Sequence, residues 1–226
     1  HGDGPPLLLL HGGTGSIPTA WIPYFAPRFK VVAMEQMGHG RTADAMDRSF
    51  HYHDMAEDTV ELLRQLEIDS AVIVGSSDGG IIGLNIAIHH PGRVTRLVLT
   101  GANARTDGYT VENQDWTRTF DPNELPVSDA YVRLSPDGPD HWPILIGRLK
   151  SMWVAEPSIT SNELRGITAP TLIIVGDGDI VTPEHAVEMF RTIPDAHLCV
   201  VPRAGHGVMP KETVLTFLEE ARAANM

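Results

Sequence analysis

Ser77 stands at the centre of the pattern Gly-x-Ser-x-Gly, between Gly75 and Gly79. The residues before this pattern are apolar and β-branched, which is typical of a buried strand, and the small and apolar residues after it predict a helix. A tight turn between such a strand and helix lifts the central serine above the edge of the sheet, and only small neighbours leave room for it. The backbone N–H of Asp78 would then point towards a developing oxyanion at the start of the helix. The pattern indicates a serine placed for nucleophilic attack.

The segment at residues 70–83 resembles the nucleophile turn of the α/β-hydrolase superfamily, in a variant with Asp-Gly-Gly after the serine. The loop His11-Gly12-Gly13 follows an apolar, strand-like run and is similar to the oxyanion loop of that family. The resemblance implies that the N–H of Gly13 is the second oxyanion donor, beside that of Asp78. A phosphate-binding loop is the alternative, but no Gly-Lys-Ser/Thr follows. His11 itself is expected to be a structural group.

Two later positions extend the resemblance. The family places its triad acid in Gly-x-x-Asp just past a strand, which falls on Asp179, and its triad histidine in a Gly-His pair, which falls on His206. Asp177 is the alternative acid, although its position is more typical of a turn. The order Ser77, Asp179, His206 is the α/β-hydrolase order of serine, acid and histidine. In the alternative register, with Asp78 as the nucleophile, the flanking glycines would lose their spacing.

A metal site is suggested by His51-Tyr52-His53-Asp54, because two histidines and a carboxylate can bind zinc. The fuller His-x-His-x-Asp-His pattern of metal lactonases is absent there, so no metal is expected. The loop from Glu35 to Thr42 is similar to the family's Asp-x-x-Gly-x-Gly-x-Ser loop, with Glu and Thr replacing Asp and Ser. His39, within this loop, is expected to have a structural role.

The residues singled out above require a sheet whose strands alternate with helices. Amphipathic or small-residue patterns predict covering helices at residues 54–67, from the serine turn to 88, and at 210–221. Short strand–helix–strand intervals predict right-handed parallel crossovers. The expected fold class is α/β, a mostly parallel sheet flanked by helices, as in the α/β-hydrolase fold. Apolar runs predict strands at 7–10, 30–34, 70–74, 96–101, 171–175 and 196–201.

The alternation of strand and helix patterns stops between residues 102 and 166, where no strand-like run occurs. The family inserts a small helical cap at this place, after its sixth-type strand. We therefore expect a core in two parts, 1–101 and 167–226, with the cap at 102–166 between them. Ordinary covering helices are the alternative. Three of the four tryptophans lie in this segment, which suits a lid over an apolar pocket. The candidate pocket residues are Trp116, Trp142 and Trp153.

The composition is typical of one globular domain. Of the 226 residues, 42% are hydrophobic, and 17 basic against 29 acidic residues give a net charge of −12. This balance argues against nucleic acid and anionic membrane surfaces as partners. No apolar run approaches the ~20 residues of a membrane helix, and no signal-like segment opens the chain, so the default expectation is a cytoplasmic protein. Because family members usually carry further strands before residue 5, the chain is expected to be part of a longer protein. Cys199, the single cysteine, is expected to be a buried thiol.

The resemblance implies hydrolysis through an acyl-enzyme on Ser77. His206 would take the serine proton and later return it to the leaving group, Asp179 would hold the imidazole, and no cofactor or metal would be needed. The expected substrate is a small-molecule carboxylic ester, with a lactone as the alternative. Carbon–carbon bond hydrolysis, perhydrolysis and a non-catalytic ligand-binding role are further alternatives.

The side chain of Asp78 has two interpretations. An aspartate in the first turn of a helix stabilises it, and this capping role is the favoured interpretation. Asp-Gly-Gly after the serine also resembles hydrolases of amino-acid esters, in which that aspartate holds the ammonium group of the substrate.

Overall fold

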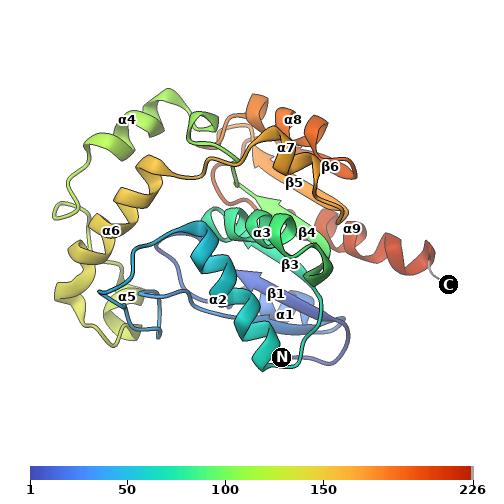
Figure 1. The fold of residues 1–226 in the computed structure, drawn as a ribbon, viewed down its shortest axis with the longest axis horizontal. Coiled ribbons are helices and arrows are strands. Elements are labelled where there is room, and N and C mark those ends of the chain that lie inside the picture. Colours follow the sequence, from blue (N-terminus) through green and yellow to red (C-terminus); the bar gives the residue numbers. More distant parts are fainter. Residues whose placement is uncertain (225–226) are drawn as a thin grey trace.

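Six parallel strands form the central sheet of the computed structural model, which describes residues 1–224 of the chain (Figure 1). Their order across the sheet is β2-β1-β3-β4-β5-β6, and every neighbouring pair is parallel. The predicted α/β class is therefore confirmed, and each predicted strand run forms a strand. The strands are β1 (Pro6–Leu10), β2 (Lys30–Ala33), β3 (Ala71–Ser76), β4 (Val94–Thr100), β5 (Thr171–Gly176) and β6 (Ala196–Val201).

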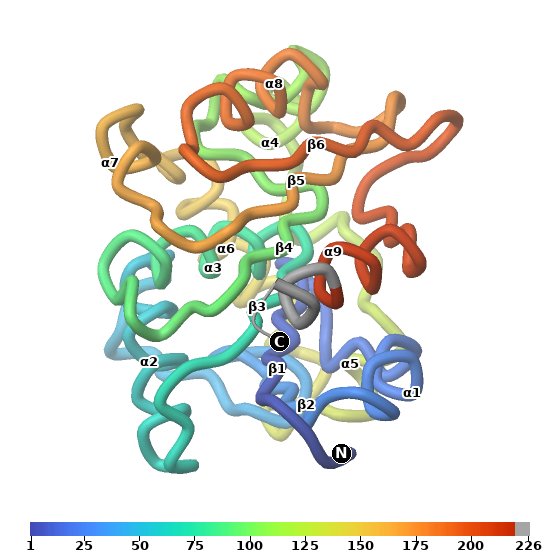
Figure 2. Tube along the Cα trace, turned by 90° about the vertical axis from the view of Figure 1, so that its right-hand side faces the viewer, coloured from blue at the N-terminus to red at the C-terminus, as the bar shows by residue number. Residues whose placement is uncertain are grey.

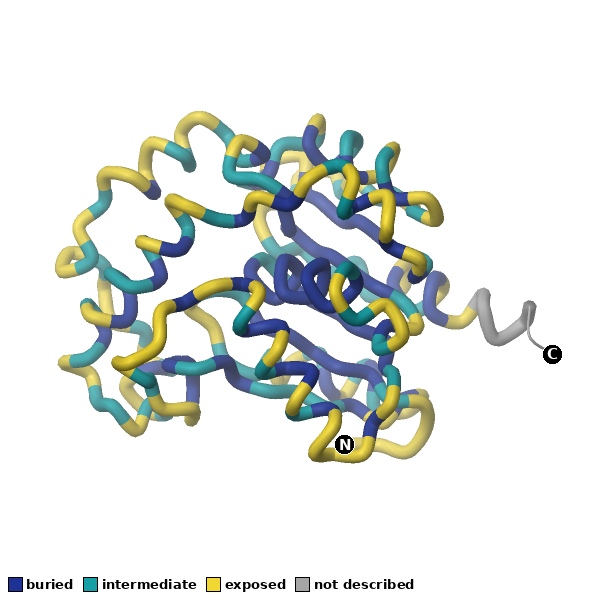
Figure 3. The backbone as a smooth tube through the Cα atoms, viewed as in Figure 1, coloured by how far each residue is buried: buried dark blue, intermediate teal, exposed yellow. Residues whose placement is uncertain are grey.

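The four leucines of β1 show how the sheet is buried on both faces. Side chains alternate along a strand, so Leu8 and Leu10 join one apolar cluster while Leu7 and Leu9 join the other. Figure 2 shows α2 and α3 on one side of the column of strands and α1 and α9 on the other, and Figure 3 shows the buried strands between them. The first cluster also includes α8. These helices are α1 (Ile22–Phe25), α2 (Tyr52–Gln65), α3 (Asp78–His89), α8 (Pro183–Thr192) and α9 (Lys211–Ala224).

The segment between β4 and β5 is helical and contains no strand within the described chain. Its α4 and α6 lie beyond the carboxyl ends of the strands (Figure 1). None of the helices in residues 1–224 is long and apolar enough to cross a bilayer. The helices of this segment are α4 (Val111–Thr119), α5 (Asp129–Leu134), α6 (Trp142–Ala155) and α7 (Ser161–Arg165). Short 3₁₀ turns occur at Pro91–Arg93, Thr106–Gly108 and Pro139–His141.

Asp44 attaches helix α6 to the loop that follows β2. Its carboxylate is 1% exposed and accepts hydrogen bonds from Arg148 and, at 2.8 Å, from His141. Arg148 also donates to the carbonyl oxygens of Ala45 and Arg48. Burial alone would raise the pKa of Asp44, but the hydrogen bonds and charges of Arg148 and His141 outweigh it and lower that pKa. The helix over the sheet is thus anchored by a buried, ionised carboxylate.

We expect Asp44→Asn to destabilise the fold, because it leaves the partly buried guanidinium of Arg148 without its counter-charge. The loss should be roughly 3 kcal/mol in the free energy of unfolding at neutral pH. Since the pKa of Asp44 is lowered on folding, this stabilisation is complete above the ordinary value of about 3.9 and is lost as the pH falls below it. Urea unfolding of both proteins should therefore show a constant difference down to about pH 5 that narrows below about pH 4.

Asp58→Asn is the matched control, because Asp58 pairs with Arg48 on the surface, where both side chains are more than 40% exposed. Exposed pairs contribute about 0–1 kcal/mol, so this variant should unfold close to wild type. Equal stability of the Asp44 and Asp58 variants would contradict the anchoring role.

Candidate active site

Ser77 forms the turn between β3 and α3, with φ 54° and ψ −123°. A positive φ at a residue with a side chain is strained, and it persists only where the surroundings enforce it. The N–H of Ser77 donates to the carbonyl oxygen of Thr100 at 2.8 Å. A Cβ on Gly75 would lie 2.3 Å from the carbonyl oxygen of Gly79, and one on Gly79 would lie 2.5 Å from that of Leu10. The flanking glycines are therefore required by close backbone contacts.

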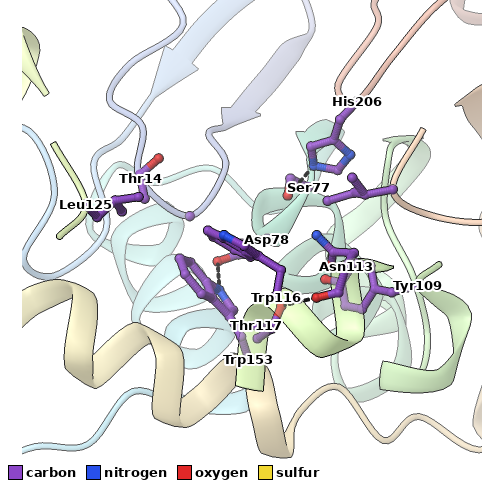
Figure 4. Close-up of a pocket in the computed structure, with 12 residues that line it drawn as sticks. Thr14, Ser77, Asp78, Tyr109, Asn113, Trp116, Thr117, Leu125, Trp153 and His206 are labelled. Atoms are coloured by element: carbon purple, nitrogen blue, oxygen red, sulfur yellow. Dashed lines mark hydrogen bonds between the residues drawn. The ribbon is translucent and has the colours of Figure 1, made fainter. Parts of the chain in front are cut away.

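Ser77, His206 and Asp179 form a continuous chain of hydrogen bonds (Figure 4 shows the first two). Oγ of Ser77 lies 2.9 Å from Nε2 of His206, whose Nδ1 lies 2.6 Å from Oδ1 of Asp179. The Asp179 side chain is fully buried, and its Oδ1 also accepts the N–H of Val181 at 3.0 Å. A carboxylate at Nδ1 keeps the hydrogen on that nitrogen and turns the lone pair of Nε2 towards the serine hydroxyl. This arrangement can make the hydroxyl nucleophilic.

Asp177 has a different environment from Asp179. Its Oδ1 accepts the N–H of Ala204 at 3.2 Å, and its own N–H donates to the carbonyl oxygen of Val201 at 3.1 Å. Asp177 therefore ties down the start of the loop that carries His206. The carboxylate on the His206 ring is that of Asp179.

Gly13 and Asp78, the predicted sources of the two oxyanion donors, both line the cavity beside Ser77. The glycine loop runs close to the nucleophile turn, because a Cβ on Gly12 would lie only 3.1 Å from the Cβ of Ser77. The carbonyl oxygen of Gly12 accepts the N–H of Gly15 at 2.9 Å, which closes the loop into a tight turn. The structure thus brings the loop and the serine together.

His11 has the structural position expected for it. Its Nδ1 lies 2.8 Å from the carbonyl oxygen of Gly12, and its Nε2 accepts the N–H of Gln36 at 3.1 Å. Burial and the charge of His39 lower the pKa of His11 to about 3, so the ring is neutral at physiological pH. A neutral ring with its hydrogen on Nδ1 satisfies both contacts.

Asp78 does more than cap α3. Its Oδ1 accepts a hydrogen bond from the hydroxyl of Tyr52 at 3.0 Å. Its Oδ2 accepts one from Nε1–H of Trp153 at 2.8 Å, which Figure 4 shows as a dashed line. The residue is 4% exposed, and burial raises its pKa against the opposing effect of these hydrogen bonds. Capping alone is therefore the wrong description, since the carboxylate joins α3 to α2 and α6 while facing the cavity.

The cavity above Ser77 has a volume of about 320 Å³. Its wall is mainly apolar and aromatic, with Asp78 as its carboxylate and no lysine or arginine among the described residues that line it. Figure 4 shows Ser77 and His206 on one side of this space and Trp153 on the other. The lining residues are Gly13, Thr14, Ser77, Asp78, Tyr109, Asn113, Trp116, Thr117, Leu125, Trp153, Ile180 and His206.

Two of the three tryptophans predicted for the pocket, Trp116 and Trp153, line the cavity. The prediction for Trp142 is wrong: it is not a lining residue, since its ring is buried against Tyr131 and its Nε1–H donates to the carbonyl oxygen of Leu125. The sequence reasoning missed several lining residues that belong to no motif. Two of them, Asn113 and Thr117, lie on α4, and no local pattern marks the face of that helix that points at the serine. The other four lie outside the helices and strands, in segments that only the fold brings to the cavity. The missed residues are Thr14, Tyr109, Asn113, Thr117, Leu125 and Ile180.

The histidines considered for a metal site point to different partners. Nδ1 of His51 lies 2.6 Å from a carboxylate oxygen of Glu156, while the ring of His53 packs edge-on against that of His89. Among the described residues, no group of three or more His, Cys, Asp or Glu side chains could hold a metal ion.

Comparisons with known proteins agree with this architecture. A model of the alpha/beta hydrolase fold matches residues 5–130. A 2-hydroxymuconate semialdehyde hydrolase of Pseudomonas sp. (strain CF600) is 28% identical, with 99% of this chain and 90% of the relative covered. A 2-hydroxy-6-oxo-6-(2'-aminophenyl)hexa-2,4-dienoic acid hydrolase of Metapseudomonas resinovorans is 26% identical, with 92% and 80% covered. The solved structure of Est816, described as an N-acyl homoserine lactone degrading enzyme, shares the fold with a TM-score of 0.72 at 24% identity, covering 99% of this chain and 94% of its own.

We expect Asp179→Asn to slow the reaction of Ser77 with a fluorophosphonate probe by roughly 10⁴, because an amide at Nδ1 favours the wrong imidazole tautomer. Asp177→Asn should leave the labelling rate within about tenfold of wild type, because its carboxylate accepts a hydrogen bond from the loop backbone at Ala204. Single-turnover labelling followed by mass spectrometry measures both rates. A larger loss in the Asp177 variant would reverse the two assignments.

Proposed function

Because the chain belongs to the α/β-hydrolase fold family, we propose that it is a serine hydrolase that cleaves carboxylic esters of small to medium, partly apolar substrates. The observation that carries the proposal is the hydrogen-bonded chain from Ser77 through His206 to Asp179 at the floor of a cavity. A pure binding module has no need for all three groups in this arrangement.

The geometry supports a two-step reaction. In the first step Nε2 of His206 accepts the Ser77 proton while Oγ attacks the ester carbonyl carbon, and the same proton then passes to the departing alkoxide. The buried Asp179 carboxylate stabilises the imidazolium that forms between these transfers. In the second step water gives a proton to His206 and attacks the acyl carbon. The bond from that carbon to Oγ breaks, His206 returns the proton to Oγ, and the acid leaves. Ser77 is restored.

The oxyanion of both tetrahedral intermediates needs donors opposite the nucleophile. The N–H groups of Gly13 and Asp78 are the proposed donors, since both residues line the cavity next to Ser77. Each such donor contributes roughly 3–4 kcal/mol to transition-state stabilisation in comparable sites. The first N–H comes from the glycine loop and the second from the start of α3, so the donors approach from two separate elements.

The charges around the cavity favour an uncharged substrate. The Metapseudomonas resinovorans relative carries a dienoic acid in its name, and an acid of that kind brings a carboxylate into its site. Here Asp78 is the carboxylate in the wall, and the described lining residues include no lysine or arginine to pair with a second one. Two carboxylates in a low-dielectric cavity repel each other strongly. A neutral ester avoids this repulsion.

A lactone is the second candidate, because a cyclic ester is also uncharged and undergoes the same attack by Ser77. The fold shared with Est816, described as an N-acyl homoserine lactone degrading enzyme, is compatible with this candidate. Carbon–carbon bond hydrolysis is less well supported. The dienoic acid named for the Metapseudomonas resinovorans relative is charged, and the wall of this cavity already carries the Asp78 carboxylate. Labelling by a fluorophosphonate separates every one of these hydrolases from a non-catalytic binder, which would bind ligand without reacting.

We expect Ser77→Ala to lower kcat on a chromogenic ester on the order of 10⁶-fold, because the nucleophile itself is lost. Ser76→Ala is the matched control, since Ser76 is the neighbouring serine at the end of β3. Steady-state kinetics on both variants, with circular dichroism to establish folding, measure the effect. Turnover retained in the Ser77 variant and lost in the Ser76 variant would contradict the assignment.

We expect esters with acyl chains of equal length to be cleaved in an order set by charge. A chain that ends in a carboxylate should have a kcat/KM at least about tenfold below that of its methyl-terminated analogue, because it meets Asp78. Asp78→Asn should reduce this difference in kcat/KM between the two esters. An α-amino ester cleaved faster than the neutral ester would instead favour ammonium binding by Asp78. A lactone panel measured alongside decides between the two substrate classes.

A further inference from the structure

His39 lies in the loop after β2, is 1% exposed, and contacts the glycine loop. Its Nδ1 lies 2.8 Å from the carbonyl oxygen of Met37, and its Nε2 lies 2.5 Å from the carbonyl oxygen of Gly13. A carbonyl oxygen only accepts hydrogen bonds, so each ring nitrogen must carry a hydrogen to satisfy its contact. An imidazole that donates from both nitrogens is the imidazolium cation.

The neighbouring His11 shows the opposite pattern, although the two ring centroids are only 5.0 Å apart. His11 faces one carbonyl oxygen, that of Gly12, and one donor, the N–H of Gln36, so its ring is neutral. The two histidines therefore hold the carbonyl oxygens of two successive residues, Gly12 and Gly13. Buried rings therefore hold the peptide group between Gly12 and Gly13 and the peptide group between Gly13 and Thr14. The first of these peptide groups contains the N–H of Gly13.

A carboxylate, that of Asp78, also lies against the loop that His39 contacts. A Cβ on Gly13 would lie 2.5 Å from Oδ2 of Asp78, so the loop held by His39 lies directly against this carboxylate. Burial raises the pKa of Asp78, while the positive charges of His39 and His206 oppose that rise. A buried carboxylate stays ionised only where hydrogen bonds and opposite charge compensate for its lost hydration. An imidazolium at His39, which contacts Gly13, is placed to supply such a charge.

We propose that His39 is a positioning residue: as a buried imidazolium it holds Gly13 by its carbonyl oxygen, keeps the oxyanion loop against the nucleophile turn, and balances the charge of Asp78. The inference rests on the proposed function, because it assigns a support to the same oxyanion site. His39 acts through Gly13 and Asp78 and does not itself touch the reacting atoms.

Two substitutions of His39 form a matched pair. His39→Gln places an amide N–H near the position of Nε2 and keeps a donor for Gly13, whereas His39→Asn is shorter and reaches only the side of Met37. We expect the Asn variant to lose roughly 10² in kcat with little change in KM, approaching the loss of an oxyanion donor. The Gln variant should stay within about tenfold of wild type. The inhibition constant of a trifluoromethyl ketone, which forms a tetrahedral adduct on the serine, should weaken in parallel with kcat.

The outcomes separate the inference from the proposed function. A wild-type protein that cleaves no ester or lactone and is not labelled by a fluorophosphonate removes the proposed function. An active wild type with Asn and Gln variants impaired equally, or not at all, overturns the role of His39 alone. ¹⁵N NMR of the wild-type histidine side chains tests the charge without any variant: two protonated nitrogens are expected for His39. A neutral tautomer at neutral pH overturns the imidazolium.

Discussion

The site depends on the close approach of the nucleophile turn to the end of β1. Gly79 packs so tightly on the carbonyl oxygen of Leu10 that a methyl group there would overlap it, and Gly75 packs in the same way on Gly79. These contacts hold Ser77 at a positive φ and place the start of α3 beside the strand end. Because the glycine loop continues directly from β1, the contact that shapes the turn also brings the proposed oxyanion donors to the serine.

Around this turn the protein buries several ionisable groups and arranges a partner for each. Asp179 meets His206 directly, whereas Asp78 is held by two neutral donors, Tyr52 and Trp153, with His39 behind the glycine loop. In a medium of low dielectric constant such groups are stable only when their charges and hydrogen bonds are matched. In the proposed mechanism His206 is the group that moves the proton, and the Asp179 carboxylate holds its ring.

The helices between β4 and β5 determine the shape of the cavity, and polar contacts attach them to the core at several places. Asp44 holds Arg148 at the middle of α6, Asp78 holds Trp153 near its end, and Glu156 accepts the N–H of Tyr52 just beyond it. One of these attachments starts from the residue next to the nucleophile. The wall of the cavity and the position of the helical segment are therefore physically linked through Asp78.

The sequence by itself predicted the α/β class, the order of the strands along the chain and a candidate triad of Ser77, Asp179 and His206. The structure brings these three side chains within hydrogen-bond distance. Strand periodicity and glycine turns are local properties, and a parallel sheet brings strand ends to one edge. Only the tertiary structure decided the rest. Trp142 and Trp153 share one face of α6, but they are separated by roughly 16 Å along its axis, so only Trp153 reaches the serine. The partners of Asp78 and the contact of His39 with Gly13 join segments far apart in the chain, and no local pattern specifies such contacts.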